Sequence, residues 1–225
     1  MNITIIANGE FPHSDEPLSY LRKAEQVVCC DGAFEKYLRR YHDLPAPPER
    51  FTVIGDGDSM SPAVWAEAEA LGLHPDRIKI SEQETNDLTK AVGYVVSEYH
   101  AANRGPLSIV IMGATGLRED HTLGNVSLLG HYAEEYPDIE FRMVSDYGIF
   151  HPVRGRKSFV SFPGQQVSLF SLTPEIPVSV EGLRYPIANR PLRQWWEGTL
   201  NEALGDRFTV DGGLLIVYQT PIQTD

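Results

Sequence analysis

The 225-residue sequence is poor in cysteine and contains no long apolar run. Its two cysteines, Cys29 and Cys30, are adjacent in an apolar segment, so they are poor disulfide candidates and are expected as buried, reduced thiols. No run approaches the ~20 apolar residues that cross a membrane. The opening residues, MNITIIANGEF, show no basic leader and too short an apolar stretch for a signal peptide. We therefore expect a cytoplasmic protein without a membrane partner.

Basic residues are also scarce. Lys and Arg number 19 against 31 Asp and Glu, which gives a formal net charge of −12. An acidic surface repels nucleic-acid backbones and anionic membranes, so neither is expected as a partner. An anionic small substrate is still compatible with this charge, because a bound divalent cation reverses the local field.

Three common motifs are missing from the sequence. There is no G-x-x-x-x-G-K-[ST] loop, no G-x-G-x-x-G after a strand and no G-x-S-x-G elbow. These absences argue against a P-loop enzyme, a dinucleotide fingerprint and an α/β-hydrolase nucleophile. The seven histidines show no spacing typical of zinc ligands.

The first two-thirds of the chain alternates short apolar runs with helical patterns. Nearly continuous apolar runs are typical of buried parallel strands, and we expect strands at residues 3–7, 27–30, 51–54, 107–112 and 140–144. Helices are expected from Ser61-Pro62, from Asp87 and from near Asp120. This alternation predicts a three-layer α/β domain with a mainly parallel sheet, which we assign to residues 1–150.

The remaining residues, 151–225, are rich in Pro, Gly and short alternating runs such as QVSLFSL and FTVDGGLLIVY. Asp211-Gly212-Gly213 between two apolar segments predicts a hairpin turn. The segment LRQWWEGTLNEAL is expected to form a long excursion with a helical turn. We expect a small all-β domain here, and its short strands favour docking or dimerisation.

Polar or glycine-rich turns follow four of the predicted strands, at Asn8-Gly9, Asp31-Gly32, Gly55–Ser59 and Gly113–Gly116. One such turn means little, because turns favour Gly, Asn and Asp for backbone reasons alone. The carboxyl ends of parallel strands meet at one edge of a sheet, which is where open α/β sheets bind ligands. Four polar turns at that edge predict a site.

The segment GDGDS places Asp56 and Asp58 two residues apart after an apolar strand. If the extended geometry persists, both carboxylates share a face and suit one hard cation such as Mg²⁺. The alternative is an acidic turn in which Asp58 or Ser59 caps the next segment. These residues alone leave both interpretations open.

The segment QETNDLTKAV offers Thr85 or Asn86 as a helix cap, with Asp87 in the first turn and Lys90 three residues later. By itself this pattern is a capped helix with an ion pair. With Asp56 and Asp58 nearby, Asp87 could instead complete a carboxylate set and leave Lys90 free to contact phosphate.

The segment GATGLREDHTLGN follows a strand and leads into a helix. Backbone N–H groups in such a glycine-rich turn suit an anion, and Arg118 adds a donor fork for phosphate oxygens. Asp120 and His121 have a plain alternative as an N-cap and its neighbour. Asn125, one turn further, would face the same way as His121.

Taken in order, these segments resemble the thiamine pyrophosphokinases, also called thiamine diphosphokinases. The matching segments are ANG, CDGA, GDGDS, QETNDLTKA, GATGLREDHTLGN, GLRYPI and EGTLNEA. They are distributed along nearly the whole chain. Each is short, but their order and spacing together are specific. The resemblance implies magnesium-dependent transfer of pyrophosphate from ATP to the hydroxyethyl oxygen of thiamine, giving thiamine diphosphate and AMP.

The resemblance also implies roles for individual residues. An α/β domain would carry ATP and magnesium, and a C-terminal β-sandwich would contact thiamine across a homodimer interface that holds the active site. The implied catalytic residues are Asp56, Asp58, Asp87 and Arg118, of which the three aspartates would hold Mg²⁺ with Asp31 nearby. The implied ATP-binding residues are Asn8, Asp31, Lys90, Arg118, Asp120, His121 and Asn125. Those implied for thiamine are Gln83, Tyr185 and Asn201.

The chain departs from the family pattern at four positions. Asn86 stands where Thr is usual, and Leu117 stands where a second glycine usually precedes the arginine. Tyr185 replaces a Trp that would stack on the thiazolium, and Leu200 replaces the Ser that precedes Asn201 in the family. The last two changes concern the thiamine contacts.

Two other functions are compatible with parts of the sequence. The D-x-D pair at Asp56 and Asp58 also occurs in haloacid dehalogenase-type phosphatases, but no later paired acidic motif is present and GATGLREDH is left unexplained. A non-catalytic module that binds a nucleotide or thiamine is the second alternative. The intact set of Asp56, Asp58, Asp87 and Arg118 argues against such a module.

Overall fold

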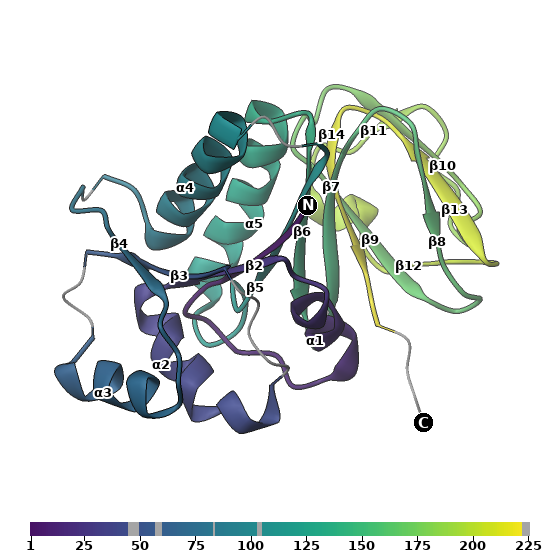
Figure 1. The fold of residues 1–225 in the computed structure, drawn as a ribbon. Helices are drawn as coiled ribbons and strands as arrows, with labels where there is room; N and C mark the ends of the chain where they lie inside the picture. The colour runs from purple at the N-terminus through teal and green to yellow at the C-terminus, as the bar shows by residue number, and fades with distance from the viewer. Residues whose placement is uncertain (45–49, 57–59, 83, 103–104, 222–225) are drawn as a thin grey trace. The chain divides into compact units, whose positions relative to one another are not determined.

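The computed structural model describes residues 1–44, 50–56, 60–82, 84–102 and 105–221, and the chain forms two compact units (Figure 1). The first unit contains residues 1–125 with 138–140 and 144–146, and the second contains residues 126–137, 141–143 and those from 147 onward. An α/β unit with a mainly parallel sheet and a β-rich unit confirm the predicted fold class. Among the described helices, none combines the length and apolar character needed to span a membrane.

The first unit is built on parallel strands in the order β5-β1-β2-β3-β4. Four of them lie where the apolar runs predicted strands, and they are buried along nearly their whole length: β1 (Asn2–Ile6), β2 (Gln26–Cys30), β3 (Arg50–Gly55) and β5 (Leu107–Met112). The expected strand at 140–144 is β6 (Ile139–Ser145), whose residues are divided between the two units. The sequence did not indicate β4 (Asp76–Lys79), because this edge strand is mostly exposed and charged and so lacks an apolar run.

Helices cover both faces of this sheet: α4 (Asp87–Ala102) lies on one face, and α2 (Asp31–Arg39) and α3 (Pro62–Ala70) lie on the other (Figure 1). The helices expected from residues 61–62, 87 and near 120 are α3, α4 and α5 (Glu119–Glu135). At the start of α4, the Asn86 Oδ1 atom accepts a hydrogen bond from the Thr89 N–H at 2.8 Å, so Asn86 is its cap. The helices α1 (Asp15–Arg22) and α2 were not predicted, because eight or nine residues give few repeats of the helical period and neither helix begins with a Ser-Pro pair like the one that indicated α3.

Aromatic packing fixes α2 and α3 on the sheet. The Phe34 ring of α2 lies 5.8 Å from that of Phe51 and 5.3 Å from that of Trp65, and Tyr37 lies 5.0 Å from Phe51, all between ring centroids. Phe34 and Tyr37 are almost fully buried. Burying each such side chain contributes about 1.5–3 kcal/mol, which holds the first turn of α2 at the carboxyl ends of the strands.

The second unit contains most of α5, part of β6 and two antiparallel sheets. One has the strand order β12-β9-β14-β7 and the other β11-β10-β13-β8. Buried side chains from both sheets form a single apolar cluster, as in a sandwich. The expected helical turn is a 3₁₀ helix at Trp195–Gly198, and a second one lies at Tyr41–Asp43 in the first unit. The strands are β7 (Gly148–Arg154), β8 (Lys157–Val160), β9 (Gln166–Ser171), β10 (Pro177–Glu181), β11 (Arg190–Pro191), β12 (Asn201–Glu202), β13 (Arg207–Asp211) and β14 (Leu214–Gln219).

The predicted hairpin at Asp211-Gly212-Gly213 is wrong. β13 pairs with β10 and β8, whereas β14 pairs with β7 and β9, so the turn carries the chain from one sheet to the other. β14 is buried at almost every position. A strand with one face in solvent would instead be exposed at every second residue. Glycine is needed where the chain passes from one sheet to the other, because a Cβ on Gly213 would lie 2.0 Å from the Thr173 hydroxyl.

Candidate active site

The polar strand ends of the first unit surround a cavity of about 380 Å³. It lies beyond the carboxyl ends of β1, β2 and β5, beside the first residues of α4 and α5. The sequence predicted a ligand site at this edge of the sheet, and five of the predicted residues line the cavity: Asn8, Asp87, Arg118, His121 and Asn125. The predicted residues Asp58 and Gln83 lie outside the described part of the chain.

Backbone contacts join the turns that follow β1 and β5. The Gly9 N–H donates to the Gly113 carbonyl at 2.5 Å, and the Glu10 N–H donates to the Thr115 carbonyl at 2.9 Å. A Cβ on Gly9 would lie 2.4 Å from the Gly113 oxygen, which no side chain tolerates. Gly113 itself has φ of +65°, in the left-handed region that favours glycine. Glycine is therefore required on both sides of this junction.

The sequence did not identify Lys36 as part of this site. From α2, its ammonium donates hydrogen bonds to the carbonyl oxygens of Asn8 at 2.6 Å and Gly9 at 2.8 Å. Burial, with a smaller effect from Arg39, lowers the pKa of Lys36. A Cβ on Gly32 would lie 2.2 Å from the Asn8 amide nitrogen, so the start of α2 also holds the Asn8 side chain. A single lysine in a helix gives no sequence signal for this role.

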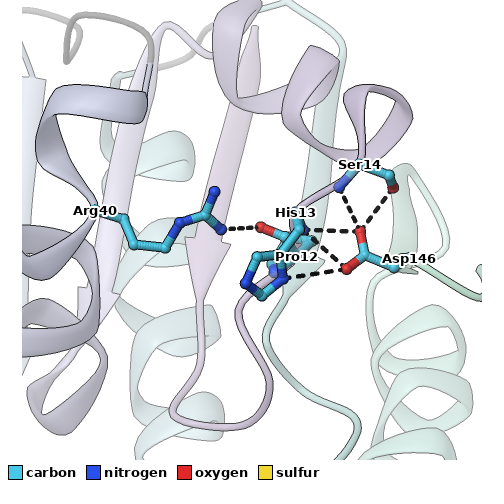
Figure 2. Close-up of polar contacts among 5 residues, drawn as sticks. All are labelled: Pro12, His13, Ser14, Arg40 and Asp146. Atoms are coloured by element: carbon cyan, nitrogen blue, oxygen red, sulfur yellow. Dashed lines mark hydrogen bonds and ion pairs between the residues drawn. The ribbon is translucent and has the colours of Figure 1, made fainter.

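The loop that runs from this turn to α1 is fixed at its far end (Figure 2). Arg40 donates to the Pro12 carbonyl at 2.6 Å, and the Asp146 carboxylate accepts hydrogen bonds from the backbone N–H groups of His13 and Ser14 and from the Ser14 hydroxyl. Burial alone would raise the pKa of Asp146, but the hydrogen bonds from Ser14 and His13 outweigh it and lower that pKa. Asp146 thereby caps a helix whose own Ser14 side chain does not cap it.

Carboxylates flank the buried thiol of Cys30. Burial, followed by the charges of Asp87 and Asp31, raises the pKa of Cys30 well above its usual value. Asp31 is itself buried, and a Cβ on Gly55 would lie 2.5 Å from the Asp31 Cβ. The expected pair of buried, unbridged cysteines is confirmed. The charges of Asp31 and Asp87 thus both act on the Cys30 thiol at the end of β2.

Lys90 lies beside the carboxylate of Asp87 in the first turn of α4. Its ammonium is 3.5 Å from the Asp87 Oδ1 atom, and its side chain is only 5% exposed. The i, i+3 ion pair of the plain interpretation is therefore present, and it holds a buried positive charge next to the cavity.

Carboxylate oxygens are the donors that a hard cation such as Mg²⁺ prefers, so the chemistry of Asp56 and Asp87, with Asp31 nearby, fits that metal. Across the described residues, no three or more His, Cys, Asp or Glu side chains are arranged to hold a metal ion. The third predicted ligand, Asp58, is not among those residues. The magnesium set therefore stays a prediction.

Arg118 is already paired. Its Nε and Nη2 atoms donate to the two carboxylate oxygens of Asp120 at 3.1 and 2.6 Å, and both side chains are well exposed. The hydrogen bonds and the opposite charges raise the pKa of Arg118 and lower that of Asp120. Asp120 does not line the cavity and instead orients the arginine that does. Asn125 donates to the Ala114 carbonyl at 2.7 Å and so holds the glycine-rich turn.

Leu117, which stands in place of a family glycine, has φ of +64°. Its side chain lines the cavity and is 71% exposed. A leucine is strained in this left-handed region, whereas a glycine adopts the same backbone conformation freely.

The residues predicted for thiamine lie in the second unit. Tyr185 is exposed, whereas Asn201 is buried. The Asn201 Oδ1 atom accepts from the Tyr185 N–H at 3.0 Å, and its Nδ2 atom donates to the Tyr185 carbonyl at 2.8 Å. The asparagine side chain therefore holds the backbone that presents the tyrosine. Leu200, beside it, is exposed and has φ of +60°.

Comparison with known families matches both parts of the chain. A family described as "Thiamin pyrophosphokinase, catalytic domain" matches residues 18–141. A second, described as "Thiamin pyrophosphokinase, substrate-binding domain", matches residues 148–218.

Individual relatives carry the same name. Thiamine pyrophosphokinase 1 of Oryza sativa subsp. japonica is 28% identical over 138 residues, which are 57% of this chain and 51% of that protein. The chain thus spans about half the length of this curated relative. The structure of thiamin pyrophosphokinase from Candida albicans has a TM-score of 0.78 at 21% identity, over 99% of this chain and 90% of that one. That of the Bacillus subtilis protein has a TM-score of 0.75 at 22% identity, over 98% and 99%. These two structures share the fold of this chain. Because the catalytic-domain match alone covers more than half of the sequence, this chain belongs to the thiamin pyrophosphokinase family.

Proposed function

We propose that this protein transfers the pyrophosphoryl group of ATP to the hydroxyl group of thiamine, forming thiamine diphosphate and AMP. The observation that carries the proposal is the cavity at the strand ends, in which Asn8, Asp87, Arg118, His121 and Asn125 come together in a member of this family. We assign ATP and magnesium to residues 1–150 and thiamine to residues 151–225.

The cavity offers the groups that a polyphosphate needs. The glycine-rich turn after β5 leads into α5 and presents backbone N–H groups to an anion, and Arg118 adds a charged donor fork. The Lys90 ammonium lies beside Asp87 and adds positive charge at the same place. Transfer of a phosphoryl-type group depends mostly on such positioning and charge neutralisation.

We assign Mg²⁺ to Asp56, Asp58 and Asp87, with Asp31 nearby. When bound, the metal would neutralise phosphate charge and orient the transferred group. The negative charges of these four aspartates are consistent with this assignment, because clustered carboxylates repel one another without a cation between them.

Thiamine carries a fixed positive charge on its thiazolium ring, which an aromatic face attracts. We assign this contact to Tyr185, whose backbone Asn201 holds, and place Gln83 between the two substrates. Tyr185, Trp196 and Leu200 are large exposed side chains of the second unit, and such surfaces often mark contacts with another chain. We propose a cytoplasmic homodimer with the active site at the interface of its subunits.

The direct test is the formation of AMP from ATP in the presence of Mg²⁺ and thiamine. Thiamine-dependent AMP release supports the proposal. Tight binding of both substrates without turnover would instead indicate a binding module, and phosphate release from phosphoesters without ATP would indicate a phosphatase. Asp87→Asn should lower kcat at least ~100-fold with little change in thiamine affinity, since the charge it removes acts on the reacting phosphates. Asp138→Asn, at an exposed aspartate, is the matched control and should keep wild-type activity.

A further inference from the structure

A second cavity, of about 250 Å³, lies at the carboxyl ends of β3 and β4. Of the described residues assigned to the reaction, Asp31 is the one that lines it. The residues around it combine apolar, aromatic and basic side chains: Asp31, Val53, Gly55, Met60, Trp65, Arg77, Ile78 and Lys79.

The strand register explains how the basic side chains reach this cavity. Arg77 pairs with Val53 and Lys79 with Gly55 in the parallel ladder of β3 and β4. Residues two apart in a strand share a face, so Arg77 and Lys79 lie on the same side of the sheet as these two neighbours. Gly55 has no side chain, and the Asp31 side chain lies against it, since a Cβ there would be 2.5 Å from the Asp31 Cβ.

Trp65, from α3, forms the wall of the cavity. The Arg77 guanidinium carbon lies 3.5 Å from the centre of its ring, which is a close cation–π contact. The tryptophan ring also packs on that of Phe34 in the core, with 5.3 Å between the ring centroids. Stacking fixes the plane of the guanidinium and leaves its N–H groups available at the ring edge.

Among the described residues, neither basic side chain has an acidic partner. Within the part of the chain that the structure describes, the side chains of Arg77 and Lys79 make no hydrogen bond or ion pair, and both are exposed. Elsewhere in this acidic chain, basic side chains such as those of Arg39, Arg154 and Arg156 have carboxylates within 3.0 Å. Two adjacent cations that retain their full donor capacity are suited to an anionic ligand.

We propose that this second cavity binds a phosphate or diphosphate group between Arg77 and Lys79, with Trp65 as the apolar wall beside it. The anion belongs at the side chains of Arg77 and Lys79, because these are the basic groups among the described lining residues, whereas Asp31 is acidic. Inorganic pyrophosphate, ATP and thiamine diphosphate all present this group. The proposal goes beyond the function proposed above and does not depend on turnover.

Tryptophan fluorescence locates the ligand, because the chain contains three tryptophans and Trp65 alone lines this cavity. The probe is inorganic pyrophosphate, added without Mg²⁺, ATP or thiamine. We expect a saturable change in emission in the wild-type protein, loss of that change in Trp65→Phe and its retention in Trp196→Phe. No saturable change in the wild type, or an unaltered change in Trp65→Phe, would overturn the proposal.

Calorimetry with the same probe tests the two cations. Lys79→Ala should weaken pyrophosphate binding at least tenfold, since it removes a charge-assisted contact while leaving the Trp65–Arg77 stack in place. Arg77→Gln should have a similar effect, and circular dichroism shows whether it folds. Lys23→Ala, at an exposed lysine, should bind as the wild type does. Binding that is kept in both Lys79→Ala and Arg77→Gln, and lost instead in Arg118→Ala at the first cavity, would place the anion elsewhere and refute the assignment.

The source of the phosphate group follows from parallel titrations with ATP and thiamine diphosphate in wild type and Lys79→Ala. The compound whose binding Lys79→Ala weakens is the natural occupant, and an unchanged affinity for all three compounds would also refute the proposal. AMP formation is measured separately. A protein that binds pyrophosphate at Lys79 but makes no AMP would contradict the proposed function and leave this inference intact.

Discussion

The carboxylate of Asp146 accepts two hydrogen bonds from Ser14, one from its backbone N–H and one from its hydroxyl, each at 2.7 Å and across 132 residues of sequence. This contact closes the first turn of α1 with a side chain from the end of β6, so a negative charge lies at the positive end of a helix dipole (Figure 2). It also anchors one end of the loop that begins in the candidate active site.

Asp146→Ala should therefore lower the free energy of unfolding by about 1–2 kcal/mol, the usual range for loss of a helix cap. The pKa of Asp146 is lowered in the folded protein, so its contribution is complete above the unfolded pKa of about 3.9 and is lost as pH falls through the folded value. Urea unfolding at neutral and acidic pH measures both effects. The difference from wild type should shrink in acid, and a constant difference would contradict this account. Asp138→Ala serves as the control.

Leu117→Gly should stabilise the protein by about 0.5–1 kcal/mol. The substitution relieves the cost of a left-handed leucine, roughly 1–2 kcal/mol, and part of this gain is offset by the greater freedom of glycine in the unfolded chain. The melting temperature reports the change. Leu123→Gly is the matched control, because Leu123 is an exposed leucine inside α5 and its loss should destabilise by about 1 kcal/mol. A lower melting temperature for both variants would show that Leu117 contributes contacts that outweigh its strain.

Lys36→Met should raise the KM for ATP several-fold, with a smaller effect on that for thiamine. The variant keeps most of the apolar stem but loses both hydrogen bonds to the Asn8–Gly9 turn, each worth about 1.5–3 kcal/mol where the donor is charged. Steady-state kinetics at saturating thiamine measures the effect. Lys23→Met, at an exposed lysine, should be silent. An equal rise in both Michaelis constants would mean that the substitution acts on the whole fold and not on this turn.

His151 predicts a second pH dependence, in the second unit. Burial, with the charges of Arg142 and Lys157, lowers its pKa to about 3. Between that value and the unfolded pKa of about 6.5 the unfolded chain binds the proton more readily, so stability rises with pH across this window by up to about 1.4 kcal/mol per unit. His151→Gln should flatten the dependence above about pH 4, where Asp146 no longer titrates. His74→Gln is the exposed control, and a slope that survives in His151→Gln would assign the dependence to another group.

Asn201→Ala should reproduce the effect of Tyr185→Ala. Each should raise the KM for thiamine by roughly 2- to 30-fold, as expected for losing about 0.5–2 kcal/mol of cation–π attraction, and leave that for ATP near wild type. The reason for their similarity is that the Asn201 amide holds both backbone polar groups of Tyr185. Titration of thiamine in the steady state measures the KM of both variants. An unchanged thiamine constant in Tyr185→Ala would exclude the stacking role.

Local patterns in the sequence were sufficient for much of the fold. Apolar runs located β1, β2, β3 and β5, because a strand buried on both faces must be apolar at nearly every residue. The same patterns placed Asn8, Asp31, Asp87 and Arg118 at strand and helix ends, which parallel topology then brings to one edge of the sheet. They missed β4, since an exposed edge strand needs no apolar residues.

Other features depend on contacts between distant segments. The turn at Asp211–Gly213 has the composition of a hairpin, but which strand β14 pairs with is decided by the sheet that buries it. The roles of Lys36 and Asp146 arise from hydrogen bonds across 27 to 133 residues, for which a lone lysine or aspartate gives no local signal. The sequence alone determined the buried strands β1, β2, β3 and β5, the helices α3, α4 and α5, the family and the polar edge of the sheet, because these depend on short-range periodicity and turn chemistry. Only the tertiary structure decided which side chains hold the active-site turn, and that Arg77 and Lys79 meet Trp65 at a second cavity, because packing and strand register bring these residues together.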